Sequence, residues 1–257
     1  MDKVPLVVGN WKMELSHKSA VEVFSAMKKM MTIKEYPVEI VVCPSYPSLA
    51  VIAAESKASG IAIGAQNIYH EERGAHTGKV SVVQIREFVT WCIIGHSEVR
   101  AAEGDSDLLI TQKAKLLLQH GITPIVCIGE SEADHAAGNT ISIISLQIDV
   151  LLSSLDRVSL LKTPIAYEPL WAIGTGVLPD SNEVCEVVLL IRKKIAEKFD
   201  TELAERVRIL YGGSVTAENV QQYISGPCAD GVLVGGASVH PRDFLAIAEQ
   251  VGHAYAR

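Results

Sequence analysis

Eight short apolar runs recur along the chain, and stretches with helical spacing separate them. Each run is almost continuously hydrophobic, which is typical of a strand that is covered on both faces. The runs are PLVVGN (5–10), VEIVVCP (38–44), IAIGAQN (61–67), TWCIIGH (90–96), ITPIVCIGE (122–130), TPIAYEP (163–169), RVRILYGGS (206–214) and DGVLVGG (230–236). Right-handed crossovers predict parallel strands, and eight strand–helix units favour a closed (β/α)8 barrel over an open doubly wound sheet.

The stretches between the runs carry signals for helix ends. Ser81 with Gln84, and Asp180 with Glu183, have the spacing of a capping box, which marks the start of a helix. Gly121 follows KAKLLLQH, where it is typical of the end of a helix. The alternation of strand and helix is therefore supported by local signals as well as by hydrophobicity.

Length and composition fit one barrel. The 257 residues are 48% hydrophobic and 21% charged, with a mean hydropathy of +0.23, so the chain can bury a sizeable core. A single closed barrel of this class has roughly 250 residues. No linker or low-complexity segment interrupts the pattern, and we expect one domain over residues 1–257. The first strand ends in GNWKM rather than G-x-G-x-x-G, which weakens a dinucleotide-binding interpretation.

Charge and cysteine content exclude several kinds of partner and site. The formal net charge of −7 argues against binding to nucleic acid or to an anionic membrane surface. The five cysteines contain no C-x-x-C, and Cys43, Cys92 and Cys127 lie in or beside apolar runs, as small core residues do, which favours a reducing compartment. The first 13 residues resemble neither a signal peptide nor a membrane span, and we expect a cytoplasmic protein.

Polar residues and glycines gather at the carboxyl ends of the predicted strands. In a parallel barrel these ends converge on one face, where the loops form the active site. The residues at these ends are Asn10, Lys12, Gln66, Asn67, His96, Glu98, Glu130, Glu168, Ser214, Gly235 and Gly236. We therefore expect the functional site on this face.

Two consecutive loops, YGGSV (211–215) and VGGAS (234–238), place paired glycines directly after an apolar strand. Glycine lets backbone N–H groups approach an anion closely. One such pair alone would indicate only a tight turn. Two pairs, in the loops where this fold often holds phosphate, predict a phosphate site.

Glu168 is the candidate base. A carboxylate base, a neutral histidine, a cation and a phosphate cradle together suit proton abstraction beside a carbonyl in a small phosphorylated sugar. His96, at the predicted start of a helix, is either a structural residue or a neutral imidazole that donates a hydrogen bond to a carbonyl. Lys12 and Asn10 could equally be surface residues. The segment 169–176, PLWAIGTG, is either an ordinary turn or a lid that excludes water.

Other polar residues do not predict further chemistry. Glu98 and Glu130 are expected to be structural partners. The eight histidines form no H-x-H or H-E-x-x-H pattern, and His70, Glu71 and Glu72 belong to a polar loop. We expect neither a metal nor a cofactor.

Motifs along essentially the whole chain resemble the triosephosphate isomerase family. They are GNWKM (9–13), GAQN (64–67), GAHTG (74–78), GHSE (95–98), CIGE (127–130), AYEPLWAIGTG (166–176), YGGSV (211–215) and DGVLVGGAS (230–238). The resemblance implies interconversion of dihydroxyacetone phosphate and glyceraldehyde 3-phosphate without a cofactor, on a TIM barrel. It makes Glu168 the base, His96 the electrophile, and Lys12 and Asn10 the groups that stabilise the enediolate. It assigns the phosphate contacts to Gly174, Ser214, Gly235 and Gly236, and a closing lid to residues 169–178.

The resemblance also implies a homodimer in which loop 70–81 of one subunit, with Thr77, reaches the other. Departures from the family pattern gather near this loop. His76 replaces the usual Phe or Tyr, Lys79 replaces an acid, and Val99 replaces an arginine. Since the acid and the arginine pair across the family interface, their joint loss indicates an altered interface rather than a broken one. Milder departures are Glu14, where asparagine is usual, and residues 177–178 at the far end of the lid.

Two other functions remain open. A relative acting on a larger ketose phosphate is opposed by the intact N-W-K and lid motifs. A barrel that only binds would be expected to lose Glu168, His96 or Lys12, and all three are present.

Overall fold

The computed structural model describes residues 3–174, 177–226 and 228–255. In this part of the chain eight parallel strands form one closed barrel in sequence order, and β8 pairs back to β1. The strands are β1 (Leu6–Asn10), β2 (Glu39–Cys43), β3 (Ile61–Ala65), β4 (Trp91–Ile94), β5 (Thr123–Ile128), β6 (Ile165–Tyr167), β7 (Ile209–Tyr211) and β8 (Gly231–Val234). The predicted (β/α)8 barrel is therefore confirmed.

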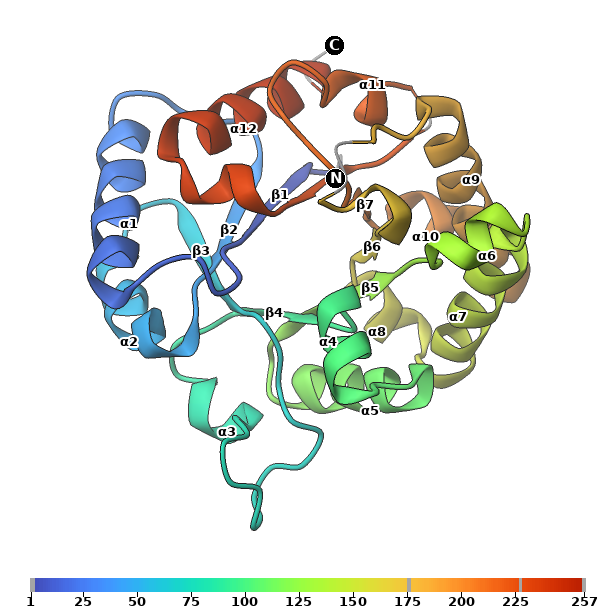
Figure 1. The fold of residues 1–257 in the computed structure, drawn as a ribbon, viewed down its shortest axis with the longest axis horizontal. Helices are drawn as coiled ribbons and strands as arrows, with labels where there is room; N and C mark the ends of the chain where they lie inside the picture. The colour runs from blue at the N-terminus through green and yellow to red at the C-terminus, as the bar shows by residue number, and fades with distance from the viewer. Residues whose placement is uncertain (1–2, 175–176, 227, 256–257) are drawn as a thin grey trace.

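Helices follow the strands and surround the barrel as an outer ring (Figure 1). The α-helices are α1 (His17–Met31), α2 (Tyr46–Glu55), α3 (Val82–Ile85), α4 (Ser97–Glu103), α5 (Asp107–Gln119), α6 (Glu132–Ala136), α7 (Thr140–Ser154), α8 (Arg157–Leu161), α9 (Ser181–Lys198), α10 (Thr201–Arg206), α11 (Gln221–Ile224) and α12 (Pro241–Tyr255). Two 3-10 helices, η1 (Leu170–Ala172) and η2 (Gly236–Val239), follow β6 and β8 closely. Across the described ranges, no helix combines the length and apolar character that a membrane span needs.

Successive strand side chains alternate between two cores. Leu6 and Val8 lie with Val41 in the cluster inside the barrel, whereas Val7 and Val42 lie in the cluster between the strands and the helices. This period of two follows from the pleat of a strand. Because both faces are covered, the strands are apolar almost throughout, which is the pattern seen in the sequence.

The helix ends largely follow their sequence signals. The Gln84 side chain accepts a hydrogen bond from the Ser81 N–H at 2.9 Å, as a capping box requires. Asp180 caps α9, but its side chain accepts from the N–H of Asn182, at 2.8 Å, which is one residue before Glu183, the partner predicted from the sequence. Gly121, with φ of +73°, follows the last residues of α5. These caps fix where the helices begin and end relative to the strands.

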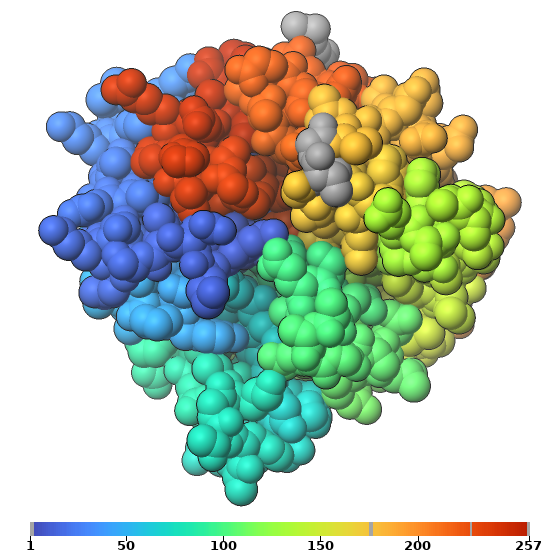
Figure 2. All heavy atoms as spheres, in the orientation of Figure 1, coloured from blue at the N-terminus to red at the C-terminus, as the bar shows by residue number. Residues whose placement is uncertain are grey.

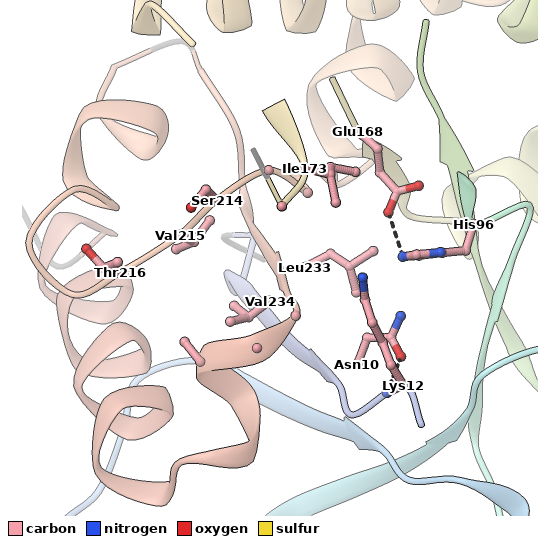
Figure 3. A pocket seen from close by; sticks show the side chains of 16 residues that line it. Asn10, Lys12, His96, Glu168, Ile173, Ser214, Val215, Thr216, Leu233 and Val234 are labelled. Carbon is pink, nitrogen blue, oxygen red and sulfur yellow. Dashed lines mark hydrogen bonds and ion pairs between the residues drawn. The ribbon is translucent and has the colours of Figure 1, made fainter. Parts of the chain in front are cut away.

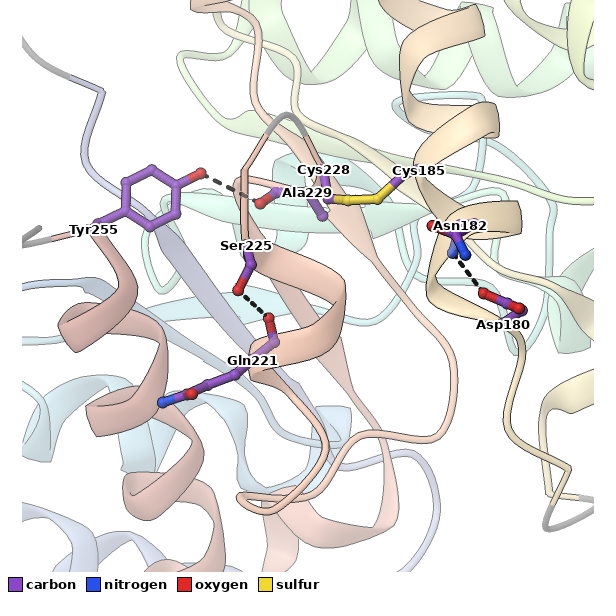
Figure 4. The surroundings of a disulfide bond; sticks show 8 residues. All are labelled: Asp180, Asn182, Cys185, Gln221, Ser225, Cys228, Ala229 and Tyr255. Carbon is purple, nitrogen blue, oxygen red and sulfur yellow. Dashed lines mark hydrogen bonds between the residues drawn. A yellow bond between two sulfur atoms is a disulfide. The ribbon is translucent and has the colours of Figure 1, made fainter.

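The cysteines differ in part from the expectation. Cys43, Cys92 and Cys127 are buried thiols in the strands, as predicted. Cys185 of α9 and Cys228, ahead of β8, form a disulfide that spans 43 residues of sequence with a Cα–Cα distance of 4.7 Å (Figure 4). No spacing pattern in the sequence indicated this pair. The bond does not fit a reducing compartment, where disulfides are rare.

Candidate active site

A cavity of about 340 Å³ lies at the carboxyl ends of the strands (Figure 3). The face of the molecule shown in Figure 2 is hollowed near its centre. The lining of the cavity includes all eight residues that the sequence predicted for the site, namely Asn10, Lys12, His96, Glu168, Gly174, Ser214, Gly235 and Gly236. Residues from distant parts of the chain are thus brought together by the closure of the barrel.

Glu168 follows the last residue of β6 and is only 2% exposed. One carboxylate oxygen, Oε2, accepts a hydrogen bond from the Ser97 N–H at 3.1 Å. The other, Oε1, lies 3.2 Å from Nε2 of His96. Burial raises the pKa of Glu168 to about 8, although the Ser97 N–H and the Lys12 ammonium oppose this rise. The result is a carboxylate that is a stronger base than an exposed one.

Two glycines make room for Glu168. A Cβ on Gly129 would lie 1.9 Å from the main-chain oxygen of Glu168, and a Cβ on Gly212 would lie 2.9 Å from its Cγ. Both distances are too short for any side chain. The position of Glu168 therefore depends on two glycines, Gly129 directly after β5 and Gly212 directly after β7.

His96 caps α4 with its own ring. Its Nδ1 accepts a hydrogen bond from the Glu98 N–H at 3.3 Å, so the neutral ring carries its proton on Nε2, the nitrogen that faces Glu168. Burial lowers the pKa of His96 to about 4, because the Glu98 carboxylate opposes this effect only in part and the Lys12 cation adds to it. The imidazole is therefore neutral near pH 7 and presents an N–H donor to the cavity.

Lys12 adopts an unusual backbone conformation, with φ of +46°. Such a conformation is strained for a residue with a side chain and persists where its surroundings hold it. Here the Asn10 side chain accepts from the Lys12 N–H at 3.1 Å, and Gln66 donates to the Lys12 carbonyl at 2.8 Å. The Lys12 ammonium pairs with Glu98 at 2.6 Å. Asn10 and Gln66 thus hold the backbone of Lys12 and so fix the direction in which its side chain points.

The far side of the cavity is formed by the loops after β7 and β8. It contains the segments 212–216 and 233–237, together with Gly174 of the segment after β6. A Cβ on Gly235 would lie 3.9 Å from the Lys12 Nζ, so the cation is close to this loop. Backbone N–H groups at glycines, a nearby ammonium group and the Ser214 hydroxyl suit an anion.

The remaining strand-end residues lie outside the cavity lining. Gln66 supports Lys12, and Asn67 accepts from the buried Lys113 at 3.1 Å. Glu98 holds the Lys12 ammonium. Glu130 is buried beneath the segment that follows Glu168. Glu98 and Glu130 therefore have structural partners, as expected, and so do Gln66 and Asn67, which were expected at the site.

The site and the fold agree with the comparisons to known proteins. The sequence model of the family "Triosephosphate isomerase" matches residues 5–251. The chain belongs to the triosephosphate isomerase family. Proteins named triosephosphate isomerase from Caldanaerobacter subterraneus subsp. tengcongensis and Carboxydothermus hydrogenoformans are each 39% identical to it, over 95% of this chain and over 98% and 97% of their own length. One from Dictyoglomus thermophilum is 39% identical over 93% of this chain and 96% of its own. The resemblance found in the sequence is confirmed.

Some contributors to the site of this triosephosphate isomerase family member were missed from sequence. The Ser97 N–H, which binds Glu168, acts through its backbone and so leaves no mark of residue type. Gly212 was noted only as half of a glycine pair, yet it makes room for the Glu168 side chain. Ile173 and Leu233 line the cavity but resemble ordinary apolar residues. Only the glycine offered a signal that could have been followed further.

Loop 70–81 projects away from the barrel (Figure 1), and Thr77 is exposed. The Lys79 ammonium pairs within its own chain with Glu103 at 2.8 Å. His76 lies 3.1 Å from a carboxylate oxygen of Glu71. Lys79, which departs from the family pattern, thus has a partner without any second subunit.

The segment 169–174 after Glu168 packs on the end of β5. The Leu170 N–H donates to the main-chain oxygen of Glu130 at 3.3 Å, and the Trp171 indole donates to the Glu130 carboxylate at 2.7 Å. The tip of the expected lid, residues 175–176, lies outside the described residues. The beginning of the lid is therefore tied to the neighbouring strand.

Proposed function

We propose that the chain interconverts dihydroxyacetone phosphate and D-glyceraldehyde 3-phosphate through an enediolate, with Glu168 as the base. The observation that carries this proposal is the contact of a fully buried carboxylate with the Nε2 of a neutral histidine, at 3.2 Å, in a cavity with two glycine-rich loops. Membership of the triosephosphate isomerase family supports the same reaction.

In the first step the Glu168 carboxylate removes a proton from the carbon beside the carbonyl, and the electron pair moves to the carbonyl oxygen. In the second step the proton is delivered to the adjacent carbon while the hydroxyl proton moves from one enediolate oxygen to the other, which gives the isomer. The pKa of about 8 for Glu168 strengthens the base and supports this role, because a C–H group gives up its proton reluctantly. The proton is transferred and returned, so no redox cofactor or metal is required by the balance of the reaction.

The enediolate oxygens carry the negative charge that develops. The Nε2–H of His96 is a neutral donor for one of them, and the Lys12 ammonium and the Asn10 amide line the same cavity. Donors fixed in advance stabilise such a charge in a site that excludes water. The left-handed backbone of Lys12 supports this role, since its strain is held by surrounding hydrogen bonds.

The phosphate of the substrate is assigned to the loops after β7 and β8. Ser214, Gly235 and Gly236 supply a hydroxyl and backbone N–H groups, and Gly174 adds to them from the lid, residues 169–178. Closure of the lid would exclude water while the enediolate exists.

The active form is proposed to be a homodimer through loop 70–81. The exposed Thr77 and the projection of this loop from the barrel support the assignment. Sedimentation equilibrium of the protein and of Thr77→Arg tests it. A monomeric wild-type protein across micromolar concentrations would contradict it.

A cytoplasmic location is proposed from the metabolic role of the family. The Cys185–Cys228 disulfide argues for an oxidising compartment instead, because such bonds persist there. Acid quenching of cells, followed by alkylation of thiols under denaturing conditions and counting of the modified cysteines, separates the two. Five modified cysteines would support the cytoplasm, and three would contradict it.

A coupled assay of glyceraldehyde 3-phosphate conversion tests the reaction and the base together. The protein is compared with Glu168→Asp, which withdraws the carboxylate by one methylene. If the position of the base matters, kcat should fall by about a hundredfold or more while the fold is retained. A wild-type protein without turnover would contradict the assigned reaction, and an unchanged Glu168→Asp would contradict the assigned base.

A further inference from the structure

A buried carboxylate fastens the chain on both sides of Glu168. The Glu130 Oε1 accepts from the Tyr167 hydroxyl at 3.1 Å and from the Trp171 indole at 2.7 Å. Tyr167 precedes Glu168 directly, and Trp171 follows it by three residues, in η1. The orientation of the base is thus linked to the position of the Trp171 ring.

The Trp171 ring is itself held from the other side by His135. This histidine belongs to α6, and its ring is stacked on the indole with a centroid separation of 4.0 Å and an interplanar angle of 17°. Its Nδ1 lies 3.8 Å from the Glu130 Oε1, which is beyond hydrogen-bond range. The imidazole therefore acts on Trp171 mainly through the stacked face, and its side chain remains 36% exposed.

The buried Glu130 carboxylate depends on accurate placement of the donors from Tyr167 and Trp171. It is 1% exposed, and Oε2 has no hydrogen-bond partner among the described residues, so its compensation comes through Oε1. Buried charges are tolerated only when their donors are well placed. A shift of the Trp171 ring would remove the closest of these donors. The stack on His135 opposes such a shift, because a stacked pair of rings loses contact when one ring moves.

We propose that His135 is a positioning residue for the isomerisation, which fixes the first turn of the lid by stacking on Trp171 and thereby orients Glu168. The inference rests on the proposed function of Glu168 as the base. His135 touches neither the cavity nor Glu168, and it acts through Trp171 and Glu130.

Three substitutions separate the stacked ring from other properties of His135. His135→Ala removes the ring, His135→Gln keeps a polar side chain without a ring, and His135→Phe restores a ring without polarity. His253→Ala is the matched control, because His253 is also a partly exposed helical histidine beside a carboxylate, with its Nε2 3.9 Å from Glu249. His253 lies in the last turn of α12, far along the chain from the lid.

Steady-state kinetics should show a loss of kcat of about tenfold in the Ala and Gln variants, with a smaller change in KM. His135→Phe and His253→Ala should remain close to wild type. Wild-type kcat in His135→Ala would overturn the proposal. So would recovery by Gln rather than Phe, since polarity and not stacking would then be the property that matters.

Acrylamide quenching of tryptophan fluorescence gives a readout that does not depend on turnover. Trp11 and Trp91 are 1% and 5% exposed, so a change in quenching reports on Trp171. Quenching should increase in the Ala and Gln variants and return to the wild-type level in Phe. If the wild-type protein proves inactive, the reaction assignment fails, whereas this measurement still tests the stack. Unchanged quenching in His135→Ala would overturn the proposal that His135 holds the Trp171 ring in place.

Discussion

The burial of Glu168 predicts a specific dependence of stability on pH. Because burial raises its pKa from 4.5 to about 8, the folded chain holds a proton between these values that the unfolded chain has lost. The free energy of unfolding therefore falls as pH rises through this interval, by about 1.4 kcal/mol per pH unit and about 5 kcal/mol in total. Ionisation of the buried Glu168 therefore lowers the stability of the folded protein.

His96 has the opposite effect in a lower range. Its pKa is lowered from 6.5 to about 4, so between these values the unfolded chain binds a proton that the folded chain does not. Stability due to His96 therefore rises with pH up to about 6.5 and then stays constant. Between pH 6.5 and 8 only the contribution of Glu168 changes among these two groups, and it should decrease by about 2 kcal/mol.

Glu168→Gln isolates this contribution. The amide keeps an oxygen that can accept from the Ser97 N–H, which Glu168 binds at 3.1 Å, and it removes the charge. Urea denaturation of both proteins, at one fixed protein concentration, should show that the variant gains about 2 kcal/mol relative to wild type between pH 6.5 and 8. The difference should flatten above about pH 9. A difference that is constant over the whole range would refute the account of a buried, costly base.

Three further substitutions test other parts of the structure. Gly212→Ala places a Cβ 2.9 Å from the Glu168 Cγ, so kcat should fall by about tenfold to a hundredfold; unchanged kinetics would show that the base has room to move. Cys185→Ser opens a loop of 43 residues and should lower the free energy of unfolding by up to about 4 kcal/mol in urea denaturation. Addition of a reductant should have the same effect on wild type and none on this variant; an equal response of both would contradict the bond. Lys113→Met leaves the carboxylate of Asp105, 2.5 Å away and buried, without its partner, and should lower the free energy of unfolding by about 3–5 kcal/mol in urea denaturation; an unchanged value would contradict a stabilising role of this pair.

The sequence predicted the barrel because its main signal is repeated eight times. A strand covered on both faces, such as 38–44, must be apolar throughout, and the crossover rule then leaves few arrangements. The sequence predicted the ends of the strands less accurately than their number. The run 206–214 contains only three strand residues, Ile209–Tyr211, because ladder pairing depends on neighbouring strands rather than on hydrophobicity alone.

Site residues with a distinctive side chain were predictable, because their place after a strand carries them to one face of the barrel. Glu168, His96 and Lys12 belong to this group. Contacts that depend on the three-dimensional placement of distant segments could not be predicted from the sequence. The disulfide between Cys185 and Cys228, the stack of His135 on Trp171 and the Ser97 N–H all join segments whose proximity only the fold creates.

The most direct test of Glu168 as the base is the exchange of the substrate proton with solvent. Dihydroxyacetone phosphate is incubated with the protein in D2O, and the products and the remaining substrate are followed by proton NMR. The account predicts that the wild-type protein forms glyceraldehyde 3-phosphate and introduces deuterium at the carbon beside the carbonyl, and that Glu168→Gln does neither at a measurable rate. Deuterium incorporation by Glu168→Gln at the wild-type rate would contradict it, because another group would then remove the proton.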